Sequence, residues 1–219
     1  METNIIYTIT TWVIPLLLCV ILHEVAHGWM AMKLGDYTAK ATGRLTLNPK
    51  EHIDPIGSLL VPGILLAMSS PILFGWAKPV PVDYRNLRKP KRDMGIVAAA
   101  GPAMNVILAI IFVLIAHVIE LLPASQTKFW LFQNLSNGIQ LSLALAIFNL
   151  LPILPLDGGR IVSSLLPLKY SIEYQKTESY GFYILIGLMF IGPMLGINVI
   201  GWFINTLYPL FLGFISIFI

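Results

Sequence analysis

Charged residues and cysteine are scarce in this chain, and each scarcity excludes a class of protein. Only 11% of the 219 residues are charged, while 57% are hydrophobic. A soluble domain of this length cannot bury so much apolar sequence in one core, so the composition predicts an integral membrane protein. The only cysteine, Cys19, lies in an apolar run, which excludes an internal disulfide and a cysteine-rich metal site. Any metal site must therefore use histidine and carboxylate ligands.

Basic clusters and targeting signals are missing as well. The net charge of +3 is not arranged as a basic face interleaved with aromatic residues, so we expect no nucleic-acid partner. The start, Met1-Glu2-Thr3-Asn4, lacks the basic region of a signal peptide, and no small-residue cleavage site follows the first apolar run. That run is therefore predicted to be a retained span, with the lipid bilayer as its environment.

Long runs without charge predict the fold class, an all-α polytopic membrane protein. A chain of 219 residues has room for five or six transmembrane helices of about 20 residues each. We expect residues 1–219 to form one integral membrane domain. Residues 181–219 carry no charge and predict a C-terminal helical hairpin that turns between Gly192 and Asn198.

The positions of basic residues predict the orientation in the membrane. Lys33 follows the first helix, expected over 5–32, so the positive-inside rule places the N-terminus outside and this end inside. Residues 95–122 then lead outward, residues 123–137 form the outer loop, and residues 138–156 return inward. The prediction is a multi-pass protein of the cell membrane with an inner C-terminus.

The apolar stretch 56–74 lies between two basic loops. A single crossing would place one of these loops outside, so we expect a re-entrant hairpin, with a full span as the alternative. Short β-strands are expected beside it at the inner interface, over Arg44–Leu47 and Trp76–Val82. Prolines restrict the second segment to an edge strand or a loop.

One motif, Leu22-His23-Glu24-Val25-Ala26-His27, places three ionisable side chains in the first helix. In a helix, His23 and His27 lie one turn apart on the same face, where two imidazoles can hold one Zn²⁺. Glu24 is then beside the metal, where its carboxylate can accept a proton from water. The alternative is a polar cluster that packs helices or relays protons without a metal.

Asp157 is the candidate for a third ligand, because a catalytic zinc takes three protein ligands and keeps one position open. At 1.5 Å per helical residue, Asp157 lies at about the depth of His23 and His27 below the outer surface. Apart from Glu24 of the motif, no other acidic residue is embedded at that depth, where an unpaired carboxylate would be destabilising. The alternative is an interfacial helix cap beside Gly158 and Gly159.

Three motifs together resemble the site-2 proteases, a family of intramembrane zinc metalloproteases. They are His-Glu-Val-Ala-His at 23–27, Gly101-Pro102-Ala103-Met104-Asn105, and Phe148-Asn149-Leu150-Leu151-Pro152-Ile153-Leu154-Pro155-Leu156-Asp157-Gly158-Gly159-Arg160. Stretches 44–54 and 75–83 also resemble the short bacterial and archaeal branch, and the catalytic core is expected over about 5–165. The PDZ insert and CBS module of other branches are missing, which leaves gating unspecified.

The resemblance implies a zinc metalloendopeptidase with one zinc ion per chain. His23, His27 and Asp157 match the family's zinc ligands, and Glu24 matches its general base. The implied reaction is hydrolysis of a peptide bond within or next to a transmembrane helix of a membrane-anchored protein. The active site is then near the cytoplasmic side, and the sequence specifies no oligomeric state.

Three further residues are predicted to lie near the substrate: Asn149, Pro155 and Asn105. An asparagine there can bond the substrate backbone or an oxyanion, because a helical peptide bond must be unwound before attack. An interhelical hydrogen bond is the alternative for both asparagines. The edge of the expected strands is predicted to bind the unwound substrate.

A zinc-binding membrane transporter without proteolysis is the alternative function. It is disfavoured because a transport site does not require Glu24 next to the first histidine. Paired inverted repeats, which many transporters contain, are also not visible in the sequence.

Overall fold

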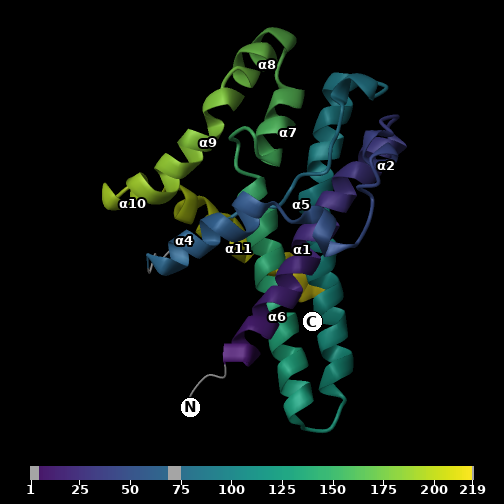
Figure 1. Cartoon of the computed structure of the whole chain (residues 1–219), viewed down its shortest axis with the longest axis vertical. Helices are drawn as coiled ribbons and strands as arrows, with labels where there is room; N and C mark the ends of the chain where they lie inside the picture. The colour runs from purple at the N-terminus through teal and green to yellow at the C-terminus, as the bar shows by residue number, and fades with distance from the viewer. Residues whose placement is uncertain (1–4, 69–74, 219) are drawn as a thin grey trace.

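The computed structural model describes residues 5–68 and 75–218, and every regular element in these ranges is helical. Long helices form a bundle, and shorter helices extend from its upper end and from one side (Figure 1). The described elements, in chain order, are α1 (Ile5–Lys33), α2 (Thr38–Ala41), α3 (Pro49–His52), the π-helix η1 (Pro55–Leu60), α4 (Val61–Ala67), the 3-10 helix η2 (Tyr84–Asn86), α5 (Pro90–Glu120), α6 (Gln126–Asn149), α7 (Asp157–Leu165), α8 (Leu168–Gln175), α9 (Glu178–Ile186), the π-helix η3 (Gly187–Ile191), α10 (Gly192–Met194), α11 (Val199–Ile215) and the 3-10 helix η4 (Ser216–Phe218). The predicted all-α class is confirmed for these residues.

Helices α1, α5 and α6 pack against one another and form the centre of the bundle (Figure 1). Their contacts bury Cys19 of α1, Leu108 and Phe112 of α5, and Leu135 of α6. A Cβ added at Gly138 of α6 would lie 2.5 Å from the Phe112 ring, so glycine is required for this close approach. The packing fixes α1, which carries both histidines of the motif, against its two neighbours.

Helix α6 begins at Gln126, which corrects the outer loop predicted over 123–137. Some of the polar residues that suggested a loop, such as Gln133, are exposed on this helix, but Asn137 lies inside the bundle. Asn137 is 1% exposed and donates from Nδ2 to the Thr11 carbonyl at 2.9 Å. Amide side chains in membrane helices are satisfied in this way by neighbouring helices. The connection between α5 and α6 is therefore limited to residues 121–125.

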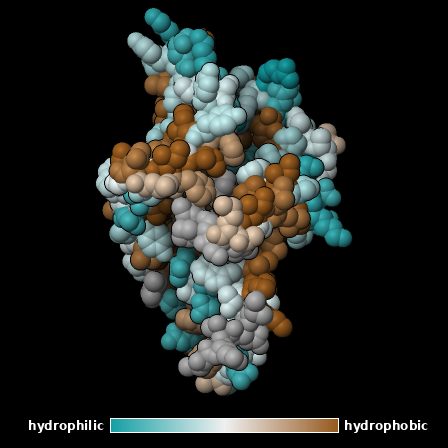
Figure 2. All heavy atoms as spheres, turned by 60° about the vertical axis from the view of Figure 1, so that its left-hand side comes forward, coloured by the Kyte–Doolittle hydropathy of each residue, from teal (hydrophilic) through white to brown (hydrophobic). Residues whose placement is uncertain are grey.

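Three helices within the described ranges are long and apolar enough to cross a membrane: 6–33, Pro90–Glu120 and Val199–Phe218. Shorter apolar helices cover Pro55–Leu65 and Glu178–Met194. Many large apolar side chains are exposed on the molecule, and Figure 2 shows hydrophobic areas on one of its faces. Exposed apolar surface of this extent suits contact with lipid.

The chain between α3 and the extended segment 75–83 leaves the bundle as η1 and α4 and then returns to its starting point. The N–H of Trp76 donates to the Gly57 carbonyl at 3.1 Å. The hydroxyl of Ser58 donates to the Trp76 carbonyl at 2.9 Å. Part of the predicted re-entrant hairpin, residues 69–74, lies outside the described residues.

Both predicted strands, Arg44–Leu47 and Trp76–Val82, are wrong for the part of the chain that the structure describes, since neither forms a strand. The second segment is held by single contacts instead of a ladder. Its Lys78 N–H, for example, donates to the His52 carbonyl at 2.9 Å. The two prolines of this segment have no N–H and therefore interrupt any ladder along it.

The C-terminal part contains two helical pairs. Helices α7 and α8 form a short pair beyond the end of α6, while α9–α10 and α11 form the predicted hairpin (Figure 1). The hairpin turns at residues 195–198, where Gly196 has φ of 75° and glycine avoids strain. Ile215 of α11 is fully buried against Ala109 and Leu143, which joins this hairpin to α5 and α6.

Candidate active site

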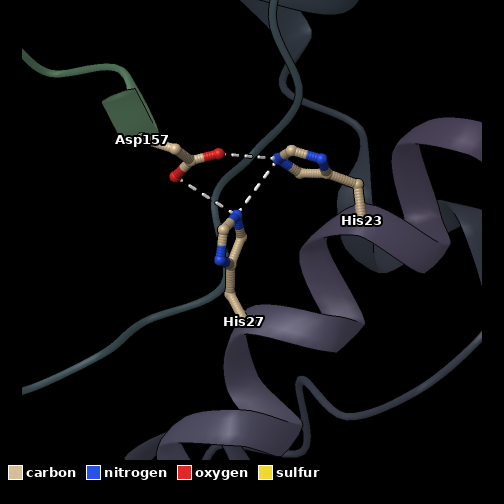
Figure 3. A group of neighbouring side chains, drawn as sticks. All are labelled: His23, His27 and Asp157. Atoms are coloured by element: carbon tan, nitrogen blue, oxygen red, sulfur yellow. Dashed lines mark hydrogen bonds and ion pairs between the residues drawn. The ribbon is translucent and has the colours of Figure 1, made fainter. Parts of the chain in front are cut away.

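Two imidazoles project from one face of α1, as Figure 3 shows. The Nε2 atoms of His23 and His27 are 3.1 Å apart, and the rings meet edge to face at 84°. The four-residue spacing produces this arrangement, because residues i and i+4 of a helix are neighbours on its surface. The two ring nitrogens therefore converge on one point beside the helix.

Asp157 completes the cluster from the first residue of α7. Its Oδ2 lies 3.3 Å from His23 Nε2, and its Oδ1 lies 3.4 Å from His27 Nε2 (Figure 3). The three side chains are only 9 to 12% exposed. The sequence prediction that Asp157 and the two histidines share one depth is therefore matched by their contact.

The glycines after Asp157 explain how α7 begins so close to the preceding turn. A Cβ at Gly158 would overlap the Leu150 carbonyl, and a Cβ at Gly159 would lie 2.6 Å from the Leu154 nitrogen. Both glycines are buried. Larger residues would push α7 away from the end of α6, so these glycines set the position of the Asp157 carboxylate.

Gly101 of α5 lies directly against the two imidazoles. A Cβ at this position would be 2.6 Å from His23 Nε2, and it would come closer still to His27 Nε2. Such separations are not found for real Cβ atoms, so a side chain at 101 would displace the rings. Glycine therefore keeps open the space on this side of the cluster.

Two groups on α5 hold the outer nitrogens of the imidazoles. His27 Nδ1 donates to the Val97 carbonyl at 2.8 Å, which orients Nε2 toward Asp157. Asn105 Nδ2 lies 3.2 Å from His23 Nδ1, and Asn105 is fully buried. Partners of this kind fix the orientation of metal-binding histidines. The structure thus places Asn105 beside His23, and the predicted contact of Asn105 with the substrate stays a prediction.

Glu24 is held by the backbone of the extended segment 75–83. Its Oε2 accepts a hydrogen bond from the N–H of Val80 at 2.8 Å. Val80 lies between Pro79 and Pro81, so its N–H is the only backbone donor of this proline-flanked stretch. Gly28, one turn further along α1, lets the segment approach, because a Cβ there would lie 2.7 Å from Val80 Cγ1.

Asp36 anchors the same segment at its far end. Its carboxylate accepts hydrogen bonds from the N–H of Asp83 at 2.8 Å and from Asn86 Nδ2 at 3.1 Å, besides bonds from Thr38. Burial raises the pKa of Asp36, but the hydrogen bonds, led by the one from the Thr38 hydroxyl, lower the pKa further, to below its usual value. The charged form of Asp36 therefore fixes residues 75–83 against the end of α1.

Asn149 and Pro155, predicted to lie near the substrate, form no hydrogen bond to the cluster within the described residues. Asn149 is the last residue of α6, and its Nδ2 donates to the Leu145 carbonyl of the same helix at 3.0 Å. Pro155 is exposed in the turn before Asp157. Their contact with a substrate therefore stays a prediction.

Sequence reasoning missed three contributors to the site: Gly101, Val97 and Val80. Gly101 belongs to the Gly-Pro-Ala-Met-Asn motif. A glycine about two turns into a predicted membrane span could have indicated a close approach of another helix at this position. The contributions of Val97 and Val80 come from their backbone, and a backbone donor or acceptor leaves no mark on the residue type.

Comparisons with known proteins agree with this geometry. The model of peptidase family M50 matches residues 115–192, which include Asp157. "Putative zinc metalloprotease YwhC" of Bacillus subtilis (strain 168) is 44% identical over 187 residues, covering 83% of this chain and 80% of the relative. "Putative zinc metalloprotease Rip2" of Mycolicibacterium smegmatis is 28% identical over 199 residues, covering 89% of this chain and 70% of the relative. No solved structure matches the chain.

We conclude from these relatives, together with the apolar helices and the His-His-Asp cluster, that the protein is a membrane zinc metalloprotease. The chain belongs to peptidase family M50, the site-2 protease family of zinc metalloproteases.

Proposed function

We propose that this protein is an intramembrane zinc metalloendopeptidase that acts on membrane-anchored proteins. It hydrolyses a peptide bond within or next to a transmembrane helix of its substrate, the reaction of regulated intramembrane proteolysis. The observation that carries the proposal is the convergence of His23, His27 and Asp157, with Glu24 adjacent in sequence to the first histidine. Each of these residue types has a defined task in zinc-dependent hydrolysis.

The cluster fits one zinc ion per chain. Its candidate ligand atoms lie within 4.8 Å of one another, and two imidazoles with one carboxylate leave a fourth position for water or substrate. Asp157 Oδ2 is buried and has no hydrogen-bond partner within the described residues, as expected of an atom that binds a metal. The space that Gly101 leaves open lies beside the same nitrogens.

Glu24 is the proposed general base, and His23, His27 and Asp157 are the proposed ligands. A bound zinc ion acts as a Lewis acid, which polarises the scissile carbonyl and makes water a stronger acid. The Glu24 carboxylate accepts the proton of the attacking water and transfers it to the leaving amine. The Val80 N–H orients this carboxylate, because its hydrogen bond occupies Oε2 and leaves Oε1 for the water.

Asn149 and Pro155 are proposed to contact the substrate. They lie at the two ends of the turn that leads into Asp157, so a peptide bound at the cluster passes this turn. The Asn149 amide can replace hydrogen bonds that a substrate helix loses when it unwinds. Asn105, which is fully buried against His23, is proposed to position that ligand instead.

Five spans and one re-entrant segment are the proposed topology. Helix α6 has 24 residues, about 36 Å of helix, which is enough to cross a hydrocarbon core of about 30 Å. Helices α1, α5, α9–α10 and α11 supply the other spans. The hydrogen bond from the Trp76 N–H to the Gly57 carbonyl brings these two residues together, which supports the expected re-entrant segment over the alternative full span. With the N-terminus outside, the cluster is then near the cytoplasmic side.

Substitution of Glu24 tests this function. The Glu24→Gln protein, purified in detergent, should retain one zinc per chain and lose cleavage of a membrane-anchored test substrate by at least about 100-fold. Glu51→Gln is the matched control, because Glu51 is exposed and the substitution removes the same charge. Retained cleavage in Glu24→Gln would refute the assigned base. Zinc flux in reconstituted vesicles without any proteolysis would support the transporter alternative.

A further inference from the structure

A cavity of about 730 Å³ lies between the start of α5 and the end of α7, away from the histidine cluster. Its rim carries the basic residues Lys89, Lys91 and Arg92, and its walls include apolar side chains of both helices, such as Ile96 and Leu165. Leu165 is 78% exposed and Ile96 is 38% exposed. The cavity therefore joins a cationic edge to an accessible apolar surface.

Its basic edge lies at the depth of lipid headgroups. Helix α5 has 31 residues and is about 46 Å long, whereas the hydrocarbon core of a bilayer is about 30 Å thick. Residues 94–119 contain no Asp, Glu, Lys or Arg, so the part of α5 that crosses the hydrocarbon lies within this range. The residues before Met94 therefore reach the interface, while Ile96 and the remaining apolar wall lie just inside it.

The positive charge of this edge is only partly neutralised by the protein. Arg92 forms an ion pair with Asp93 at 2.7 Å, and Asp93 is fully buried. Lys89 and Lys91 form no ion pair with any described residue, although Lys89 contributes to the electrostatic field at Asp93. Two lysine ammonium groups thus remain available for an anion beside the apolar walls.

We propose that this cavity binds one anionic phospholipid from the leaflet at this end of α5. Its phosphate lies between Lys89 and Lys91, and an acyl chain lies along Ile96, Ile161 and Leu165. Basic pockets between membrane helices bind anionic headgroups in this way, and the charges of the two partners are complementary. The acyl chains of a neutral lipid can pack against the same apolar walls, but a neutral lipid has no net charge to offset the two lysine ammonium groups.

The bound lipid contacts α7, which carries the proposed ligand Asp157, and α5, which holds the imidazoles in place through Val97 and Asn105. Ile96 precedes Val97, whose carbonyl accepts from His27, and Ile161 lies one turn after Asp157. Helices α5 and α7 already pack directly at Gly95 and Ser164, and a lipid that lies across both helices adds contacts that hold this packing. This consequence for the cluster rests on the proposed function, whereas lipid binding itself does not.

Native mass spectrometry of the full-length protein tests the proposal, with phosphatidylglycerol and phosphatidylcholine as probes. Wild type should retain one phosphatidylglycerol in preference to phosphatidylcholine. Lys89→Gln/Lys91→Gln should weaken phosphatidylglycerol binding by about 25-fold, at about fivefold for each charge. The matched control, Lys40→Gln/Lys50→Gln, removes two exposed lysines elsewhere and should change binding less than about twofold. Ile96→Trp narrows the apolar part of the cavity, keeps every charge and should also reduce binding.

Four results would overturn the proposal. Equal retention of both lipids by wild type would show that the charge plays no part. Equal weakening in the control variant would show only general surface attraction. Displacement of phosphatidylglycerol by millimolar inorganic phosphate, or loss of a dimer in Lys89→Gln/Lys91→Gln, would assign the cavity to a soluble anion or to a second copy of the chain.

Discussion

Gly101→Ala is the substitution that tests the geometry of the cluster most sharply, because it adds one methyl group and changes no charge. The new Cβ would lie 2.6 Å from His23 Nε2 and closer still to His27 Nε2. Ordinary contacts of a Cβ atom begin at about 3.4 Å, so the rings must move by about 0.8 Å or more. Zinc–nitrogen bonds of about 2.0 Å tolerate errors of only about 0.2 Å.

The expected result is a loss of zinc affinity of at least about 100-fold, the upper end of the effect of losing a supporting partner. The protein itself should remain folded, since α5 continues past this residue and alanine favours helix over glycine. Zinc content after dialysis against a graded chelator series measures the affinity, and circular dichroism measures the helix content.

Gly213→Ala is the matched control, because nothing lies within 4 Å of a Cβ at this position in α11. It should bind zinc like the wild type. A zinc affinity of Gly101→Ala equal to that of the wild type would refute the placement of the histidine rings against α5. If Gly101→Ala loses zinc because it is unfolded, its circular dichroism spectrum will show the loss of helix.

Three further predictions concern the surroundings of the cluster. Val80→Pro removes the N–H that binds Glu24, so kcat should fall by about 10- to 100-fold while zinc content is unchanged. The control, Val80→Ala, keeps the N–H and should cleave at a near wild-type rate. Equal rates for both variants would contradict the role of the Val80 N–H in orienting Glu24. Asp36→Asn should lower the free energy of unfolding at pH 7 by about 2 kcal/mol, since the carboxylate accepts several hydrogen bonds. The pKa of Asp36 is lower in the folded protein than in the unfolded chain, so its carboxylate stabilises the fold above pH 3.8 and this stabilisation is lost as the pH falls through the folded pKa. The stabilities of wild type and Asp36→Asn should therefore converge in acid. A difference that stays constant with pH would contradict the role of the Asp36 carboxylate. A reporter fused at Trp76 should report the inner side, and an outer signal would replace the re-entrant segment with a full span.

The ligand cluster could be predicted from the sequence because two simple rules determine it. Helical spacing brings His23 and His27 together, and the alternation of basic loops brings Asp157 to the same depth. Both rules act over long charge-free segments, where membrane topology leaves few alternatives. The C-terminal hairpin was predictable for the same reason, since Gly192–Asn198 interrupts a charge-free run.

The start of α6 and the two strands could not be predicted by the same rules. Asn137 reads as a loop residue, yet it is satisfied inside the bundle by the Thr11 carbonyl. The segments 44–47 and 76–82 have strand-like composition, but strands also need partners with free N–H groups. In the second segment, one N–H that remains between prolines donates to Glu24 instead. Such pairings depend on tertiary contacts and not on residue type.

Zinc stoichiometry of the wild type against Asp157→Ala tests the central claim most directly. Both proteins are purified in the same detergent, dialysed with a weak chelator and measured by elemental analysis. The proposed site predicts one zinc per wild-type chain and less than about a tenth of that in Asp157→Ala, because two histidines alone hold zinc weakly. One tightly bound zinc in Asp157→Ala would contradict the assignment of Asp157 as the third ligand.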